Sequence, residues 1–233
     1  MKVGTINIDW FLKNETTKKL IIERICQQDF DFLIVTENIE DFTFSEKYFV
    51  YHSDRIPLNT TYENLDYGFY LKGKQAIRTS IYSKYPSIKK NKVEDSFTSI
   101  CHTFLVDGKS ITIYGTIIGT WGILHQKTLA KKELLNFIKD SEGFHQYENM
   151  IVAGDFNTSF IVSENREMAQ INSRAIIKLQ ADRIGMTIPT EKINNNIDAI
   201  LISRNLQPKE ISVFITEEEL KDKFHKGIFL EIN

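Results

Sequence analysis

Residues 149–160 read NMIVAGDFNTSF, in which an apolar run ends abruptly in polar residues. The run MIVA has the length and the composition of a strand that is buried on both faces. Gly154, Asp155 and Asn157 follow it, and only Phe156 separates the carboxylate from the carboxamide. Alternate side chains of an extended chain point the same way, so we expect Asp155 and Asn157 on one side and Phe156 in the packing. Gly154 leaves room for another segment of backbone to approach closely.

Three further strand-like segments stop at polar residues, in the stretches TINID, VTEN and NNID. The polar residues at these ends are Asn7, Asp9, Glu37, Asn195, Asp198 and, just before the last apolar segment, His225. Each of them taken alone is explained as a turn former or a helix cap. Taken together, carboxylates at the ends of neighbouring strands would repel one another unless a cation lay among them. Acid and amide oxygens are the ligands that Mg²⁺ and Mn²⁺ prefer, so the pattern indicates a hard divalent cation.

The rest of the chain mixes helices and strands without strict alternation. Apolar residues recur at helical spacing in residues 16–28, 126–140 and 173–185. Between residues 48 and 118, the segments YFVYH, YGFYL, AIRTSIYS, TSICHTFLV and SITIYGTII are separated by turn-forming residues. These five segments predict a meander of antiparallel strands. NIDAILIS, EISVFIT and KGIFLEI predict three final strands.

Composition bounds the class of protein. The 233 residues are 42% hydrophobic and contain no linker-like stretch, which predicts a single domain spanning residues 1–233. The net charge of -2 offers no overall attraction to a polyanion, so any contact with nucleic acid would be local. No apolar run reaches the ~18 residues of a membrane span. We therefore expect a cytoplasmic protein without membrane contact, a monomer by default, in which Cys26 and Cys101 are small buried residues.

Two other patterns have competing interpretations. DGKS, residues 107–110, matches the tail of a phosphate-binding loop, but the first glycine of that motif would fall on Thr103. A type I′ hairpin at Asp107 and Gly108 explains the stretch better. SIKKNK with Lys84, and KQAIR with Arg78, would form either a basic rim for a nucleic-acid backbone or ordinary solvated faces. Solvated faces are the simpler interpretation.

Seven segments in order resemble the endonuclease/exonuclease/phosphatase superfamily: TINID, DFLIVTE, SIYSKYP, YGTIIG, IVAGDFN, NIDAILIS and HKGIFLEI. The resemblance runs from residue 2 to residue 232. It implies an α+β fold, a four-layer αββα sandwich of two mixed, mainly antiparallel sheets flanked by helices. It also implies Mg²⁺-dependent hydrolysis of phosphate esters, with Mn²⁺ as a substitute. In this resemblance Glu37 is the principal metal ligand, and Asn7 and Asp9 are near enough to bind the ion or its waters.

The resemblance also implies catalytic roles. Asp155 is similar to the residue that orients and deprotonates the attacking water, and Asn157 to the one that hydrogen-bonds this water and the phosphate. Asp198 is similar to the residue that fixes the tautomer of His225, whose imidazolium would bind the phosphate or assist proton transfer. Either Asp155 or His225 would serve as the base. Asn7 would be a further contact to the substrate.

Two positions depart from the pattern of the superfamily. Its members commonly have Ser-Asp-His before the last strand, where this chain has Lys223, Phe224 and His225. Because Phe224 can only pack against the imidazole and desolvate it, we expect His225 to titrate at a lower pH than it would beside an acid. Members also often carry a His or Tyr phosphate donor after the YGT-like strand, where this chain has Ile117.

The sequence thus predicts a Mg²⁺-dependent phosphoesterase, more specifically a phosphodiesterase or endonuclease that hydrolyses the backbone of DNA or RNA. Lipid-cleaving members usually have long apolar hairpins, and inositol phosphatases usually have longer chains with basic pockets; neither feature is present. Two alternatives remain open. One is a phosphatase that acts on a small phosphate ester. The other is a catalytically weakened member that binds nucleic acid or a protein partner.

Overall fold

The computed structural model of the chain describes residues 1–56, 61–62, 65–66, 77–119, 126–168 and 172–233. The strand expected at residues 67–71 lies outside these ranges. Within them, no helix combines the length and the apolar character that a membrane span requires.

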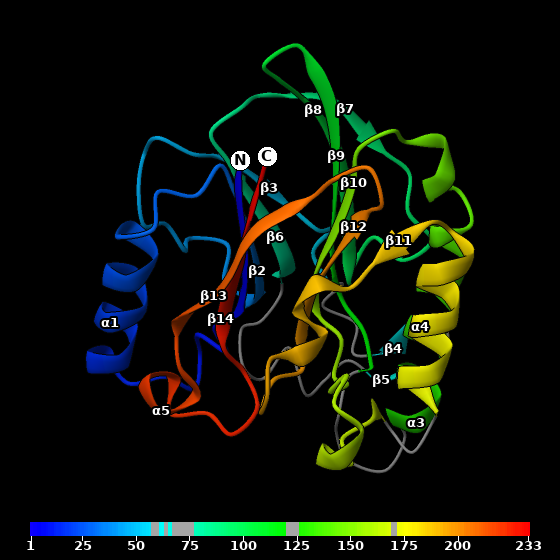
Figure 1. Cartoon of the computed structure of the whole chain (residues 1–233). Coiled ribbons are helices and arrows are strands. Elements are labelled where there is room, and N and C mark those ends of the chain that lie inside the picture. Colours follow the sequence, from blue (N-terminus) through cyan, green and yellow to red (C-terminus); the bar gives the residue numbers. More distant parts are fainter. Residues whose placement is uncertain (57–60, 63–64, 67–76, 120–125, 169–171) are drawn as a thin grey trace.

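The first of two six-stranded sheets has the order β13-β14-β1-β2-β6-β3 (Figure 1). Its strands are β1 (Lys2–Asn7), β2 (Phe32–Asn38), β3 (Phe49–His52), β6 (Ile77–Ser83), β13 (Pro208–Ile215) and β14 (Gly227–Ile232). β1 and β2 are parallel and are joined through α1 (Glu15–Cys26), whereas the other neighbouring pairs are antiparallel. The short helix α5 (Glu217–Leu220) connects β13 to β14.

The second sheet has the order β11-β12-β10-β9-β8-β7. Its strands are β7 (Ser87–Asn91), β8 (Ser99–Val106), β9 (Lys109–Ile117), β10 (Met150–Asp155), β11 (Met186–Thr187) and β12 (Asp198–Ser203). It repeats the pattern of the first sheet, because its one parallel pair, β9 and β10, is also joined through a helix, α3 (Gln126–Ser141). Helix α4 (Ser173–Arg183) and the short strands β4 (Thr61–Tyr62) and β5 (Leu65–Asp66) complete the main elements.

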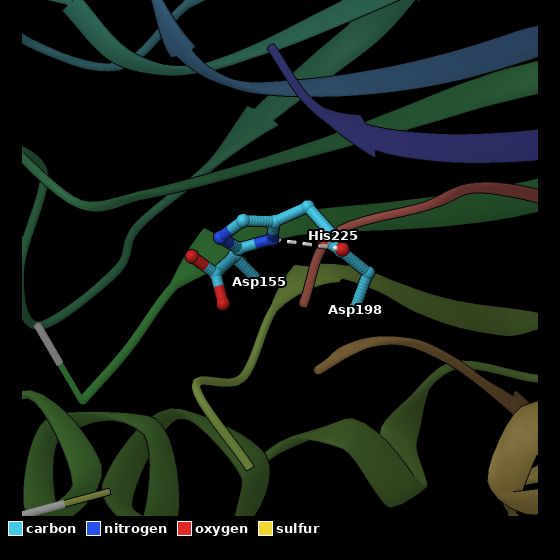
Figure 2. A group of neighbouring side chains, drawn as sticks. All are labelled: Asp155, Asp198 and His225. Carbon is cyan, nitrogen blue, oxygen red and sulfur yellow. Dashed lines mark hydrogen bonds and ion pairs between the residues drawn. The ribbon is translucent and has the colours of Figure 1, made fainter. Parts of the chain in front are cut away.

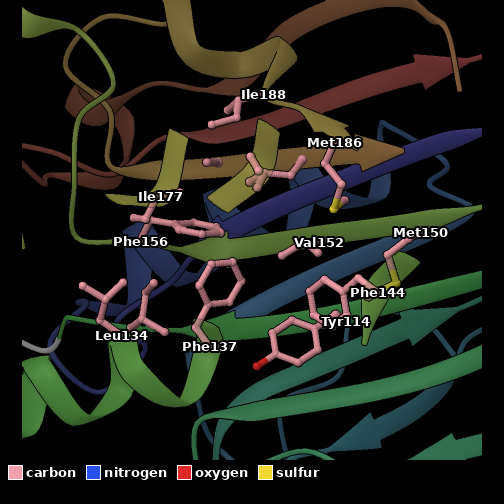
Figure 3. Close-up of a cluster of buried hydrophobic side chains, with 14 of the residues drawn as sticks. Tyr114, Leu134, Phe137, Phe144, Met150, Val152, Phe156, Ile177, Met186 and Ile188 are labelled. Atoms are coloured by element: carbon pink, nitrogen blue, oxygen red, sulfur yellow. The ribbon is translucent and has the colours of Figure 1, made fainter. Parts of the chain in front are cut away.

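Three clusters of buried apolar side chains separate four layers. The middle cluster lies between the sheets and includes Ile34, Ile113, Ile151 and Ile228. A second cluster fills the space between the first sheet and α1. The third, which contains Phe137, packs the second sheet against α3 and α4 (Figure 3). Each fully buried side chain of this size contributes about 1.5–3 kcal/mol through the hydrophobic effect. Because α1 and α5 lie outside one sheet and α3 and α4 outside the other, the expected four-layer α+β sandwich is confirmed (Figure 1).

Several local expectations are corrected by this arrangement. The segments between residues 48 and 118 do not form one meander, because β3 and β6 join the first sheet whereas β8 and β9 join the second. The lysine-rich run SIKKN forms the edge strand β7, with exposed Lys89 and Lys90, and it was missed because it lacks apolar alternation. Cys26 is exposed, whereas Cys101 is buried as expected. The hairpin at Asp107 and Gly108 is confirmed, since it joins β8 to β9 with φ of 48° and 77° at these residues.

Arg78 is neither part of a basic rim nor solvated. Its side chain is 1% exposed, and its Nη1 atom lies 3.2 Å from Oε1 of Glu133, which is equally buried on α3. This ion pair connects β6 of the first sheet with a helix that covers the second. Loss of one partner would leave a buried charge uncompensated, which typically costs about 3–5 kcal/mol.

Candidate active site

The polar strand ends of the two sheets meet at one place. Asn7 ends β1, Asp155 ends β10, Asp198 begins β12, and His225 precedes β14. The Asn7 Nδ2 atom donates a hydrogen bond of 3.0 Å to Oδ2 of Asp155, and this bond joins the two sheets directly. Asp155 and Asp198 are also cross-strand partners in the antiparallel pairing of β10 with β12. Residues separated by as many as 218 positions in sequence therefore share one buried cluster.

Asp155 is buried and accepts hydrogen bonds at both carboxylate oxygens. The backbone N–H of Asn157 donates to Oδ1 over 2.8 Å, and its Nδ2 atom donates to Oδ2 over 3.2 Å, beside the bond from Asn7. Burial and the neighbouring charge of Asp198 raise the pKa of Asp155, and the nearby His225 and these N–H donors counteract the rise only in part. The result is a fixed carboxylate with greater basicity than one in water.

Asn157 reaches this position through a turn and not through strand alternation. Strand β10 ends at Asp155, and Asn157 has a left-handed backbone with φ of 46°. Its Nδ2 atom also donates to the carbonyl oxygen of Ile118 over 3.0 Å. Phe156 is fully buried, as expected, and lies edge-on to Phe137. The two polar side chains do lie on one side, but the cause is the tight turn between them.

Gly154 allows the close backbone approach that the sequence predicts. Its φ is 148°, and a Cβ atom at this position would lie 1.8 Å from the carbonyl oxygen of Thr116 on the adjacent parallel strand. No side chain fits there, so only glycine lets β10 pair with β9 up to Asp155.

His225 and Asp198 form an ion pair at the centre of the cluster (Figure 2). The His225 Nδ1 atom lies 3.0 Å from Oδ2 of Asp198, whose side chain is completely buried. Burial alone would lower the pKa of His225, but the charges of Asp198, Asp155 and Asp222 outweigh burial and raise this pKa to about 10. His225 is therefore cationic near neutral pH, and the comparison with an acid at position 224 stays a prediction.

Asp222 supplies an acid near His225 that the sequence pattern does not predict. Its Oδ1 atom accepts the backbone N–H groups of Lys223, Phe224 and His225, over 2.7, 3.0 and 3.3 Å. The carboxylate thus holds the loop before β14 and adds negative charge near the imidazolium. The sequence signal was an Asp at the start of a turn, three residues before His225, which is a common capping pattern.

Glu37 and Asp9 form a second acidic group beside this cluster. Both have left-handed backbones, with φ of 53° and 36°, and such strain costs on the order of 1 kcal/mol for a residue like Glu37. The N–H of Trp10 donates to the carbonyl oxygen of Glu37 over 3.2 Å, which ties the loop after β1 to the end of β2. The N–H of Asp9 donates to Oδ1 of Asn7 over 2.9 Å. Asn7 thereby connects the two acidic groups.

The charges of this second group are not balanced. Burial and the charge of Glu37 raise the pKa of Asp9 to about 7, although Lys13 counteracts the rise. Burial also raises the pKa of Glu37, and the positive charge of Arg78 offsets this only in part. Two carboxylates that are hard to ionise, next to an amide oxygen, are the oxygen set that a hard divalent cation requires. The residues at this position therefore fit such an ion.

The residues described also contain one Asp/Asp/His group that could hold a metal. One ligand atom each of Asp155, Asp198 and His225 lies within 4.8 Å of the others. His225, however, is cationic near neutral pH and has no lone pair to offer while its Nδ1–H bonds to Asp198. A cation is better accommodated by Glu37 and Asp9.

Asn195 and Ile117 contribute no polar side chain to the buried cluster. Asn195 is exposed, whereas its neighbour Asn196 is buried and accepts the N–H of Asp198 at Oδ1 over 3.3 Å. Asn196 was missed because three consecutive asparagines give no signal to choose among them. Ile117 is 1% exposed and pairs with Asp155 across β9 and β10, so it contributes packing and no hydrogen-bond donor.

No protein-family model matches the chain, and no curated protein matches it in sequence. Solved structures do match over its full length. A 3'-5' exonuclease (NExo) from Neisseria meningitidis superimposes with a TM-score of 0.69 at 12% identity, with 100% of both chains covered. An AP endonuclease from Archaeoglobus fulgidus gives 0.68 at 12% identity, covering 100% of this chain and 99% of that one. An endonuclease/exonuclease/phosphatase family protein from Leptotrichia buccalis gives 0.65 at 14% identity with the same coverage. The chain therefore has the fold of the endonuclease/exonuclease/phosphatase superfamily.

Proposed function

We propose that the chain is a single-domain, metal-dependent phosphoesterase that hydrolyses phosphodiester bonds of DNA or RNA. The observation that carries this proposal is the buried cluster in which Asp155, fixed by Asn7 and Asn157, lies beside a cationic His225. Such a cluster places a base, Asp155, and a positive charge, the imidazolium of His225, within a few ångströms of each other. Hydrolysis of a phosphate ester needs both, because water must lose a proton while negative charge builds on the phosphoryl oxygens.

In the proposed mechanism, Asp155 orients the attacking water and accepts its proton. Its raised pKa brings the carboxyl group nearer to neutrality, where a general base is most effective. The Asn157 side chain lies next to the carboxylate, where its Oδ1 atom would accept a hydrogen bond from the same water. Its Nδ2 atom would reach a phosphoryl oxygen by giving up its bond to the carbonyl oxygen of Ile118. Asn7 keeps the carboxylate in place from the opposite sheet.

In the proposed mechanism, the imidazolium of His225 supplies positive charge to the phosphate. Asp198 accepts the bond from Nδ1, which fixes the orientation of the ring. The other nitrogen, Nε2, lies 3.4 Å from Nδ2 of Asn7, and in an imidazolium both of these atoms are donors. The Nε2–H group therefore remains available for a phosphoryl oxygen or for the leaving group.

Glu37 and Asp9, with Oδ1 of Asn7, would hold Mg²⁺ or Mn²⁺. Such an ion supplies positive charge to the phosphoryl oxygens and the leaving group when it is bound. The raised pKa of Asp9 and of Glu37 supports this assignment, since both groups lack sufficient positive charge nearby.

A nucleic-acid substrate is favoured over a small ester by the similar structures. Their descriptions include an exonuclease, an AP endonuclease and a 3' phosphatase bound to a product DNA hairpin. The human nocturnin catalytic domain, similar at a TM-score of 0.65 and 13% identity, was solved with a sulfate anion. A member that only binds is less well supported, because the Asp155, Asp198 and His225 cluster is complete in this chain.

The test is a turnover screen with matched variants. Supercoiled plasmid, abasic duplex, single-stranded DNA, RNA and bis-p-nitrophenyl phosphate would each be incubated with Mg²⁺, Mn²⁺ or EDTA. We expect cleavage that requires the metal and falls at least about 10²-fold in Asp155→Asn. Asp107→Asn is the matched control, because it makes the same change at the far end of β9 and keeps a favoured turn sequence. Equal turnover by Asp155→Asn and Asp107→Asn on every substrate would refute the proposal.

A further inference from the structure

Arg166 differs from the other arginines of the chain. All seven arginines lie in the described ranges. Those that pair with a carboxylate are Arg24, Arg55, Arg78, Arg174, Arg183 and Arg204. Arg166 has no carboxylate partner among the residues that the structure describes. Its guanidinium carbon instead lies 3.5 Å from the ring centroid of Phe224, and its Nη1 atom donates to the carbonyl oxygen of Lys223 over 3.3 Å.

The ring under Arg166 belongs to the loop that carries His225. Phe224 directly precedes His225, and its carbonyl oxygen accepts the N–H of Ile197 over 3.1 Å. Ile197 in turn directly precedes Asp198. The ring of Phe224 is therefore connected to both segments that carry the His225–Asp198 pair, namely the loop before β14 and the start of β12.

The backbone of Arg166 is fixed from two sides. Its carbonyl oxygen accepts the N–H of Ser159 over 3.0 Å, and the largely buried Arg174 bonds to the carbonyl oxygens of both Ser159 and Arg166, over 2.6 and 3.4 Å. Glu164, on the same loop, accepts the N–H of Asn195 over 2.7 Å. These bonds brace the loop after β10 against α4 and against the loop before β12, so the backbone that carries the Arg166 side chain is held in place.

A guanidinium that lies flat on an aromatic ring keeps its edge free for hydrogen bonds. Arg has five N–H donors in one plane, and stacking uses the face of that plane. One of these donors, at Nη1 of Arg166, bonds to the carbonyl oxygen of Lys223. The remaining edge matches two oxygens of a phosphate, in the bidentate geometry that makes such bonds strong. A cation that is fixed in position and not paired with a carboxylate is suited to an anionic ligand.

We propose that Arg166, held over the ring of Phe224, binds a phosphate of the substrate that neighbours the one being cleaved. This inference rests on the proposed function and extends it, because every polynucleotide carries such a neighbouring phosphate, whereas an ester with a single phosphate does not. Arg166 and Phe224 would then select nucleic acid among phosphodiesters. The ligand chemistry is a backbone phosphate, which DNA and RNA share.

Binding without turnover tests Arg166 directly. The affinity of a fluorescein-labelled single-stranded oligonucleotide would be measured by anisotropy in EDTA, at salt concentrations from about 50 to 200 mM. Loss of one phosphate contact should lower the slope of log K against log[salt] by about 0.7. We expect this decrease in Arg166→Gln, and a largely retained slope in Arg166→Lys, which keeps the charge. Arg183→Gln, which alters an exposed arginine on α4, is the matched control and should keep the wild-type slope.

Kinetics supply the second readout. We expect kcat/KM of Arg166→Gln on the oligonucleotide to fall about tenfold relative to its kcat/KM on bis-p-nitrophenyl phosphate, which has one phosphate. Phe224→Leu keeps an apolar side chain but removes the aromatic face, and it should shift the same ratio in the same direction. An equal loss on both substrates would mean a structural effect and would overturn the inference.

The two proposals fail in different ways. If wild type cleaves nucleic acid and Arg166→Gln keeps the wild-type salt slope, Arg166 is not a phosphate contact and the proposed function stands. If wild type binds the oligonucleotide with a slope that depends on Arg166 but cleaves no phosphoester, the proposed function is wrong and the binding site is right. If wild type does not bind the oligonucleotide, the inference is overturned.

Discussion

Binding of a divalent cation by Glu37 and Asp9 should release protons, in an amount that depends on pH. Burial and the charge of Glu37 raise the pKa of Asp9 to about 7. A carboxylate must be deprotonated to act as a ligand. With that pKa, Asp9 carries roughly 0.9 proton at about pH 6, about 0.5 at about pH 7 and about 0.1 at about pH 8. Cation binding should release these fractions, together with a contribution from Glu37, whose pKa is also raised.

Titration calorimetry measures this release. Mg²⁺ or Mn²⁺ would be titrated at each pH into protein in two buffers that differ in ionisation enthalpy, and the difference in apparent enthalpy gives the number of protons released. Asp9→Asn should remove most of the pH dependence, and Glu37→Gln should weaken binding by more than about tenfold because it removes a charged ligand. Asp107→Asn should behave as wild type, since Asp107 lies in an exposed turn.

The raised pKa of Asp9 also determines whether the stability of the fold rises or falls with pH. Because the folded state raises the pKa of Asp9 above its unfolded value, the folded state binds more protons between about pH 4 and pH 7. The Asp9 contribution to stability is therefore lost as pH rises through this window when no cation is present. Mg²⁺ should raise the melting temperature more at about pH 8 than at about pH 6. Proton release that is the same at all three pH values, or unchanged by Asp9→Asn, would show that the cation does not bind here.

Three further predictions concern the buried cluster. Asp155→Asn should lower kcat by about 10²-fold or more and leave the melting temperature unchanged or higher, because burial already disfavours the charge; a variant with wild-type kcat would remove Asp155 from the mechanism. Gly154→Ala should cost about 3 kcal/mol or more in urea unfolding, since its Cβ atom would lie 1.8 Å from an oxygen of Thr116, and a normal midpoint would contradict the close approach. The folded pKa of His225 is raised to about 10, so its ion pair stabilises fully below about pH 6.5 and this stability is lost as pH rises through about 10. The melting temperature of His225→Gln should thus differ most from wild type below about pH 6.5, and a difference that grows with pH would refute the assignment.

The central strands could be predicted because their sequences carry the signal locally. β1, β2, β10 and β12 are apolar runs bounded at one end by a polar residue of the site, and the hairpin at Asp107 and Gly108 has the residues that a left-handed turn needs. The edge strand β7 has no such pattern, because one of its edges and most of its side chains face solvent. Assignment of β3 and β6 to one sheet and of β8 and β9 to the other also depends on contacts distant in sequence.

The residue types of the candidate site could be predicted from the sequence, but the charge interactions among these residues could not. Asp222 was overlooked because its distance from the imidazole depends on how the loop before β14 folds onto it. The sequence predicts a solvated Arg78, whereas its charge lies near Glu37 and is buried against Glu133. The raised pKa of His225 follows from three carboxylates that converge on it from different elements. A pKa depends on burial and on neighbours in space, and neither is encoded at the residue itself.

The sequence by itself determined that the central strands are buried and that acids, amides and a histidine stand at or next to their ends. These properties are local, because apolar periodicity and turn chemistry act over a few residues. The tertiary structure alone decided that Asn7 of one sheet holds Asp155 of the other, and that Arg166 lies on Phe224 beside His225. Hydrogen bonds and charge interactions act over a few ångströms, so only the packing of two sheets could bring these residues within range of one another.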